Sequence, residues 1–199
     1  MHTSTAIKPG YDRITSILGH FSGYDNVPSF ILEQAKQRGT AVHKMYEEMS
    51  TGKKASEFNP AYKGYYDSLC RWMEGKNFLF PIDRLYNDEL MITGMIDGIY
   101  EDANGLILFD LKTSASIGRT WTQQMGGYLK LLSSISINID RVEIIQINRK
   151  GEDAIITTIC CDKTNEPMFN LDCMNSFLEC WRIFDKFFRH KEEIDLEKL

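Results

Sequence analysis

The chain has 199 residues, of which 43% are hydrophobic and 26% are charged, with 14 glycines and five prolines. This composition is typical of a globular protein and excludes collagen-like and disordered chains. No run of about 18 apolar residues occurs, and residues 1–9 lack an apolar stretch, so we expect neither a membrane span nor a secretion signal. We therefore expect a cytoplasmic protein with a single domain over residues 1–199, in which residues 1–12 form a flexible lead-in.

The net charge is −5, from 23 basic and 28 acidic residues. Such a balance disfavours a protein that coats nucleic acid with one large basic surface, so any such contact must come from a local basic patch. The cysteines form no C-x-x-C pair, and we expect reduced, mostly buried thiols and no zinc or iron–sulfur site. These are Cys70, Cys160, Cys161, Cys173 and Cys180.

Apolar periodicity predicts helices and strands along the whole chain. The first expected helix starts at residue 14 and ends near Gly19 or Gly23, and the second covers residues 29–50, where Gly39 could divide it. The other expected helices cover residues 59–75, 120–134 and 167–190. The expected strands cover residues 78–86, 90–100, 106–112, 142–148 and 154–161. We expect Ser29 to cap its helix, and Phe187 and Phe188 to lie on the core side of theirs. The order of elements predicts an α/β fold with a central mixed sheet flanked by helices.

The hairpin around Asn104-Gly105 is the most informative segment, because this dipeptide is a strong turn signal. A two-residue turn at these positions puts Asp97 opposite Lys112, and a longer loop puts it opposite Asp110. Both registers place the two carboxylates and the ammonium on one face of the hairpin. The opposite face then carries the core residues Ile107, Phe109 and Leu111.

These three side chains match the needs of phosphodiester hydrolysis. Two carboxylates can hold Mg²⁺ or Mn²⁺, which activates water and neutralises charge on phosphorus. A lysine beside them can stabilise the negative charge that develops in the transition state. The alternative is a cross-strand salt bridge on a solvent face, although the apolar neighbours are unusual for an exposed pair.

The string Gly94-x-x-Asp97, followed by Asp110-x-Lys112-Thr113, resembles the core of the PD-(D/E)XK nuclease superfamily, in its RecB-like, phage-type exonuclease branch. Three further segments agree, in the order of that branch. They are Ile14–Leu18, similar to its T-x-I-L opening, Arg38–His43, similar to its R-G-T-x-x-H helix, and Gln124-x-x-x-Tyr128, similar to its Q-x-x-x-Y helix.

The resemblance implies a restriction-endonuclease-like core and a Mg²⁺ or Mn²⁺ site. His43, Asp97, Asp110 and the Leu111 carbonyl would hold the metal, and Lys112 would be the catalytic lysine. Many members of the superfamily have glutamate where Asp110 stands. The cysteine spacing does not match the iron–sulfur staple of some RecB-type nucleases, so we expect no cluster.

Two interpretations of Gln124 and Tyr128 are open. They stand at i and i+4 of the expected helix, and either hold the lysine or a DNA phosphate, or form a buried hydrogen-bonded pair. Arg119, just before that helix, is the best candidate for a phosphate contact. Other basic candidates are Lys8, Arg13, Arg38, Lys44, Lys130 and Arg149.

We therefore expect a Mg²⁺- or Mn²⁺-dependent deoxyribonuclease, an exonuclease in recombination, repair or phage DNA processing. The alternatives are an endonuclease of the same superfamily and an inactive nucleic-acid-binding module on the same fold. The expected partner is DNA, either duplex or single-stranded, and we expect no contact with a membrane. A homo-oligomer and a recombination partner protein both stay open.

Overall fold

The computed structural model describes residues 7–24, 27–56, 58–79, 84–161 and 170–189. Its helices are α1 (Ile14–Gly19), α2 (Ser29–Ser50), α3 (Lys63–Met73), α4 (Trp121–Ser133) and α5 (Asn170–Phe184), with a 3₁₀ turn at Pro60–Tyr62 and a π-helical turn at Asp185–Arg189. Its strands are β1 (Asp12–Arg13), β2 (Asn77–Leu79), β3 (Leu85–Asn87), β4 (Ile92–Gly94), β5 (Gly98–Asp102), β6 (Gly105–Lys112), β7 (Arg141–Gln146) and β8 (Ile155–Cys161). Within these ranges no helix combines the length and apolar character needed to cross a membrane.

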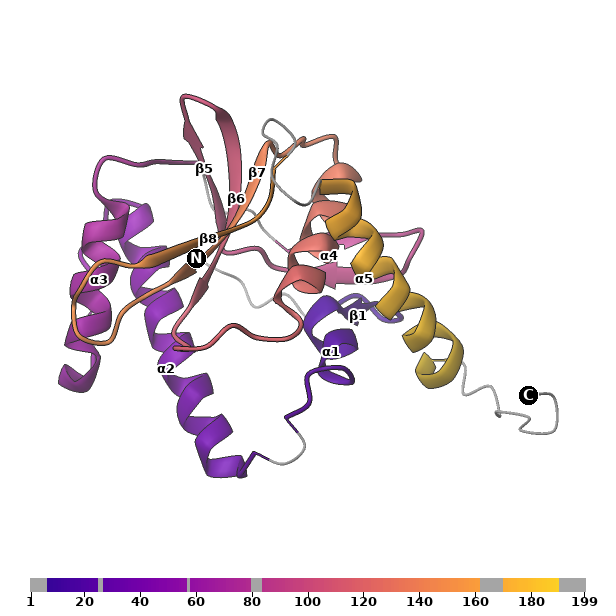
Figure 1. Cartoon of the computed structure of the whole chain (residues 1–199), viewed down its shortest axis with the longest axis horizontal. Helices are drawn as coiled ribbons and strands as arrows, with labels where there is room; N and C mark the ends of the chain where they lie inside the picture. Colours follow the sequence, from indigo (N-terminus) through magenta and orange to yellow (C-terminus); the bar gives the residue numbers. More distant parts are fainter. Residues whose placement is uncertain (1–6, 25–26, 57, 80–83, 162–169, 190–199) are drawn as a thin grey trace.

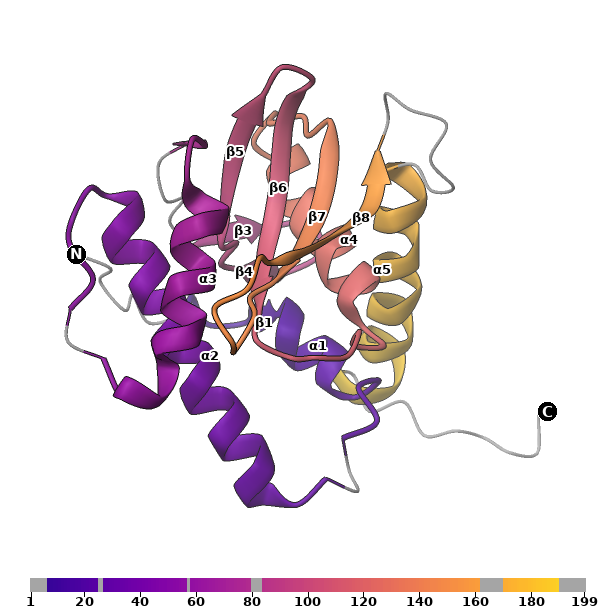
Figure 2. The same cartoon turned by 60° about the vertical axis from the view of Figure 1, so that its left-hand side comes forward.

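The main sheet has five strands over the described residues, in the order β2-β5-β6-β7-β8. Strands β6 and β7 are parallel, and the other neighbours are antiparallel. Helix α4 connects the parallel pair, as a crossover must. Helices α2 and α3 lie on one side of this sheet, with α4 and α5 on the other (Figures 1 and 2). The predicted α/β fold, a mixed sheet flanked by helices, is confirmed.

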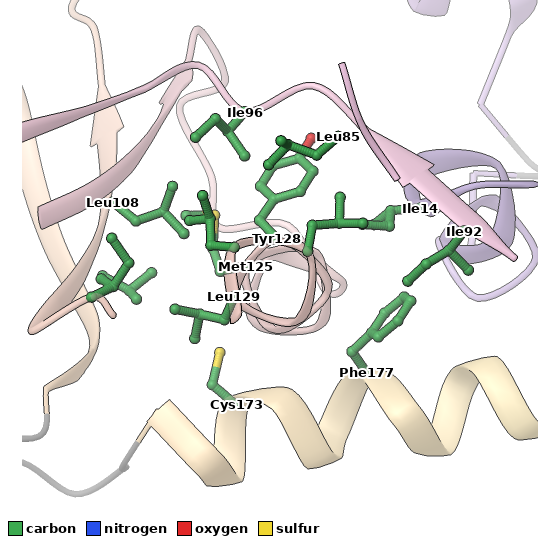
Figure 3. Close-up of a cluster of buried hydrophobic side chains, with 14 of the residues drawn as sticks. Ile14, Leu85, Ile92, Ile96, Leu108, Met125, Tyr128, Leu129, Cys173 and Phe177 are labelled. Carbon is green, nitrogen blue, oxygen red and sulfur yellow. The ribbon is translucent and has the colours of Figure 1, made fainter. Parts of the chain in front are cut away.

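Both faces of strand β6 are buried, because helices cover the sheet from two sides. On one face, Leu108 packs against α4 and α5 in the cluster shown in Figure 3. On the other, Phe109 packs among aromatic rings of α2 and α3, with Trp72 at 4.9 Å and Tyr46 at 5.4 Å between centroids. Asp110 therefore points to the same covered face as Leu108.

A smaller mixed sheet, in the order β1-β4-β3, was not expected. The predicted strand over 78–86 is wrong, because β2 and β3 belong to different sheets; residues 80–83 lie outside the described part. The predicted strand over 90–100 is also wrong, because the chain leaves the small sheet after Gly94 and joins the main sheet at Gly98. A Cβ on Gly94 would lie 3.0 Å from side-chain atoms of α4, so this crossing passes directly against that helix.

Three smaller expectations also need correction. Ser29 does not cap α2, because it is already helical and the Pro28 carbonyl accepts the first turn's hydrogen bonds. The lead-in ends before residue 12, since Asp12–Arg13 pairs with β4; residues 1–6 lie outside the described part. Phe187 and Phe188 are 37% and 44% exposed, because the last turn changes to a π-helix. The ends of that predicted helix, residues 167–169 and 190, lie outside the described part of the chain.

The described cysteines are free thiols, which agrees with the expectation for Cys70, Cys160, Cys173 and Cys180. Two of them, Cys160 and Cys173, are buried, and the other two are half-buried. Cys173 lies in the contact between α5 and α4, where its thiol donates to the Thr122 carbonyl.

The contact between α4 and α5 depends on Gly126. A Cβ at this position would lie 2.0 Å from the Cys173 carbonyl oxygen, which is fixed in the backbone of α5. We expect Gly126→Ala to lower the free energy of unfolding by about 1–3 kcal/mol, measured by urea denaturation.

Gly39 supplies the matched control, since it is also helical and a Cβ there would meet nothing within 4 Å. We expect Gly39→Ala to raise the free energy of unfolding by up to about 1 kcal/mol through its higher helix propensity. Equal urea midpoints for the two variants would contradict this account of the α4–α5 contact.

Candidate active site

Asp110 and Lys112 form an ion pair at the end of β6, on the face that α4 covers. Lys112 Nζ lies 2.6 Å from Asp110 Oδ2, and Asp110 is only 2% exposed. Gln124 of α4 bridges the pair, since its Oε1 accepts from Lys112 Nζ at 3.0 Å and its Nε2 donates to Asp110 Oδ1 at 2.9 Å. The same Nε2 donates to the Tyr128 hydroxyl at 2.9 Å. Gln124 therefore contacts the lysine and also forms a hydrogen-bonded pair with Tyr128, so features of both open interpretations are present.

His43 and Asp97 form a second pair next to the first. His43 comes from α2, and its Nδ1 lies 3.0 Å from Asp97 Oδ1. Asp97 Oδ2 accepts the Leu111 backbone N–H at 2.6 Å, which ties the carboxylate to β6. Asp97 lies in the extended segment between β4 and β5, where a change of sheet brings it to the end of β6.

The hairpin register decides between the two expected arrangements. Asp102 pairs with Gly105 and Gly98 with Phe109, so the turn falls at Ala103-Asn104. The register that put Asp97 opposite Lys112 is wrong. Continuing the observed register by one residue puts Asp97 across from Asp110, just beyond the last paired residue.

Burial and charge shift the pKa values of these groups. Burial raises the pKa of Asp110, and the Lys112 ammonium opposes that shift. Burial disfavours the Lys112 ammonium, but the Asp110 carboxylate outweighs this and the pKa of Lys112 is raised. Asp97 raises the pKa of His43 to about 9, against the effect of burial. In this arrangement each carboxylate has a cation beside it.

The chemistry of the donors fits a hard divalent cation, since carboxylates with one imidazole are ligands that Mg²⁺ and Mn²⁺ accept. Asp110 Oδ2 is buried and has no hydrogen-bond partner among the described residues, although the Lys112 ammonium meets it as an ion pair. Within the same residues, no three His, Cys, Asp or Glu side chains are already arranged to hold a metal ion. A bound cation would thus neutralise the Asp97 and Asp110 carboxylates, which His43 and Lys112 now neutralise.

The exposed Arg119 lies outside this hydrogen-bond network in the described structure. Its guanidinium lies beside Gly23, since a Cβ on that glycine would lie 3.3 Å from it. Arg119 does precede α4, as the sequence indicates, but the structure does not bring it to the Asp110–Lys112 and His43–Asp97 pairs.

A cavity of about 230 Å³ adjoins the network through Tyr128 and carries two arginines that face it from different elements. Arg13 comes from β1, and Arg84 precedes β3, where it donates to Met95 Sδ at 3.1 Å. Sequence reasoning missed Arg84 as a site residue, because it reaches the site only through the unexpected small sheet.

No family model matches the chain, and no curated protein matches it. Among solved structures, it is similar to the crystal structure of an alkaline exonuclease (LHK-Exo) from Laribacter hongkongensis, with 11% identity over 92% of this chain and 93% of that chain, at a TM-score of 0.42. A structure of LHK-Exo in complex with dAMP matches with 10% identity over 91% and 93% of the two chains, at a TM-score of 0.35. A likeness this distant carries no argument about function, which must be inferred from the residues of the site.

The buried ion pair makes Lys112 important for stability. Replacing it with alanine leaves the Asp110 carboxylate buried without its cation, and we expect Lys112→Ala to cost about 3–5 kcal/mol of unfolding free energy. Adding Asp110→Asn removes the stranded charge and should recover most of that loss. Urea denaturation of the two single variants and the double variant gives the coupling energy.

Lys63→Ala is the control, because Lys63 forms an exposed ion pair with Asp67 on α3. Its loss should cost less than about 1 kcal/mol. If Lys112→Ala and Lys63→Ala lower the free energy of unfolding by the same amount, the Asp110–Lys112 pair stabilises the fold no more than an exposed ion pair does.

Proposed function

We propose that the chain is a Mg²⁺- or Mn²⁺-dependent deoxyribonuclease, an exonuclease that hydrolyses phosphodiester bonds. The observation that carries the proposal is the meeting of two carboxylates, an imidazole and a half-buried lysine from separate segments of the chain. The interpretation as a salt bridge on a solvent face fails, because Asp110 is buried. Titratable groups whose pKa values are shifted by burial and by each other are typical of functional sites.

Each residue of the site has a role in this proposal. Asp97 and Asp110 hold the metal, with His43 and the Leu111 carbonyl as further ligands. When bound, the divalent ion supplies an activated water and neutralises charge on the phosphate. Lys112 stabilises the negative charge that develops at the water and the scissile phosphate.

Gln124 acts as a positioning residue in the same scheme. Its amide oxygen accepts from the Lys112 ammonium and its amide nitrogen donates to Asp110, so it fixes the two relative to each other. Tyr128 holds the amide of Gln124 in this orientation.

The two arginines beside the site support an anionic substrate. Arg13 and Arg84 line a cavity next to Tyr128, and guanidinium groups bind phosphate oxygens well. The sequence motifs favour DNA and a role in recombination, repair or phage DNA processing. An endonuclease of the same superfamily is the alternative, because the same chemistry serves both.

Lys112→Ala tests the chemical role of the lysine. Removing a group that stabilises transition-state charge lowers the rate by about 10²–10³. DNA affinity should stay, since the lysine does not ligate the metal; because the variant is destabilised, the assay is run at a temperature at which circular dichroism shows it to be folded. The measurement is a time course with Mg²⁺ or Mn²⁺ on linear duplex, linear single-stranded and closed circular DNA, with Lys63→Ala as the control and products ending in 5′-phosphate and 3′-hydroxyl.

The substrates distinguish the alternatives. Cleavage of linear forms alone means an exonuclease, and nicking of circles means an endonuclease. If wild type and Lys112→Ala are equally inert on all three, the inactive binding module replaces the proposal.

Metal binding tests the carboxylates. Isothermal calorimetry with Mn²⁺ should show binding that Asp97→Ala and Asp110→Ala each weaken at least about tenfold, because each removes a charged oxygen ligand. Asp67→Ala on α3 is the control and should bind Mn²⁺ like wild type. Ca²⁺ should bind without supporting turnover. Unchanged Mn²⁺ affinity in both site variants would rule out this metal site.

A further inference from the structure

A second cavity, of about 260 Å³, opens at the carboxyl ends of the parallel strands β6 and β7. Thr113 and Ser114, which follow β6, line it on one side. The β7–β8 loop lines it on the other, with Asn148, Arg149, Lys150 and Glu152. Carboxyl ends of parallel strands are where open α/β sheets bind ligands.

The β7–β8 loop is fixed to α3 through its backbone. The Asn148 backbone N–H donates to Ser68 Oγ at 3.0 Å, and Asn148 Oδ1 accepts the Lys150 N–H at 2.7 Å. Gly64 of α3 lets the loop approach, since a Cβ there would lie only 1.8 Å from the Arg149 carbonyl oxygen. The side chains of Arg149 and Lys150 are exposed on this fixed backbone.

The cavity has more positive than negative charge. Arg149 and Lys150 line it against one carboxylate among the described residues, Glu152, which already accepts from Asn148 Nδ2 at 3.0 Å. Arg38 of α2 adds a third cation at its rim, where its Nε donates to Thr113 Oγ1 at 3.1 Å. This is a local basic patch on a chain whose net charge is −5.

The cavity begins at the residue that follows Lys112 in the chain. Thr113 directly follows Lys112, whose carbonyl accepts the Ile147 N–H at 2.8 Å. The Ser114 carbonyl accepts from Gln146 Nε2 at 3.0 Å, so the segment after Lys112 is tied to the end of β7. A strand whose scissile phosphate lies beside Lys112 can therefore run on across the ends of β6 and β7.

We propose that this cavity binds a backbone phosphate of the DNA strand whose cleavage takes place at Lys112. The Arg149 and Lys150 side chains supply the charge, and the Thr113 hydroxyl, which accepts from Arg38, has its own proton to donate. The inference rests on the proposed function. It adds a binding site that positions the strand without reading its sequence, because all its contacts are to phosphate.

The double variant Arg149→Ala/Lys150→Ala tests this site. With Ca²⁺ in place of Mg²⁺, fluorescence anisotropy on a duplex oligonucleotide should show about tenfold weaker binding, independent of sequence. The slope of log K against log salt should become shallower by about 0.9 for each phosphate that the variant no longer neutralises. The control is Lys53→Ala/Lys54→Ala, which removes the same charge from exposed lysines on another surface and should bind like wild type.

The outcomes separate this inference from the proposed function. If wild type binds and cleaves DNA and Arg149→Ala/Lys150→Ala binds as tightly with the same salt slope, the cavity is not a phosphate site. If wild type neither binds nor cleaves DNA, the proposed function itself fails. A third arm titrates inorganic phosphate: loss of its binding in the double variant with unchanged DNA affinity would assign the cavity to free phosphate and overturn the proposal.

Discussion

Burying the Asp110 carboxylate at the end of a central strand is the constraint on which the arrangement of the site depends. An isolated charge in such a place costs several kcal/mol, and an ion pair offsets this only when further hydrogen bonds complete it. Lys112 supplies the cation, and Gln124 completes the hydrogen bonds to both partners. Helix α4 must therefore pack on this face with Gln124 in its first turn. Close contacts at Gly126, against α5, and at Gly94 of β4 hold the helix there.

Two basic cavities lie on either side of the paired charges of the site. Arg13 and Arg84 lie on the α4 side of the sheet, beside Tyr128. Arg149 and Lys150 lie where β7 ends, toward α3. An acidic protein can in this way offer phosphate contacts at a few fixed places, rather than over a broad basic surface. On the proposed function, a DNA strand would pass the carboxylates with its phosphates held on either side.

Periodicity was sufficient to predict the elements with one strong pattern, such as residues 29–50, 106–112 and 120–134. It could not show the break at residues 95–97, because Met95 and Ile96 continue the apolar run of the strand before them. The hairpin register depended on which two residues make the turn, and both choices put acidic residues on one face. Arg84 and the cavity at the end of β7 depend on contacts between distant segments, which no local spacing encodes.

The central claim is that Asp97 and Asp110 hold a divalent metal in place of the His43 proton and the Lys112 ammonium that now face them. The most direct measurement is anomalous diffraction from crystals soaked with Mn²⁺. We predict one strong peak within bonding distance of both carboxylates and of His43, with Lys112 Nζ no longer on Asp110 Oδ2 but still donating to Gln124 Oε1. A crystal at saturating Mn²⁺ that shows no such peak, with the Asp110–Lys112 ion pair intact, would contradict the claim.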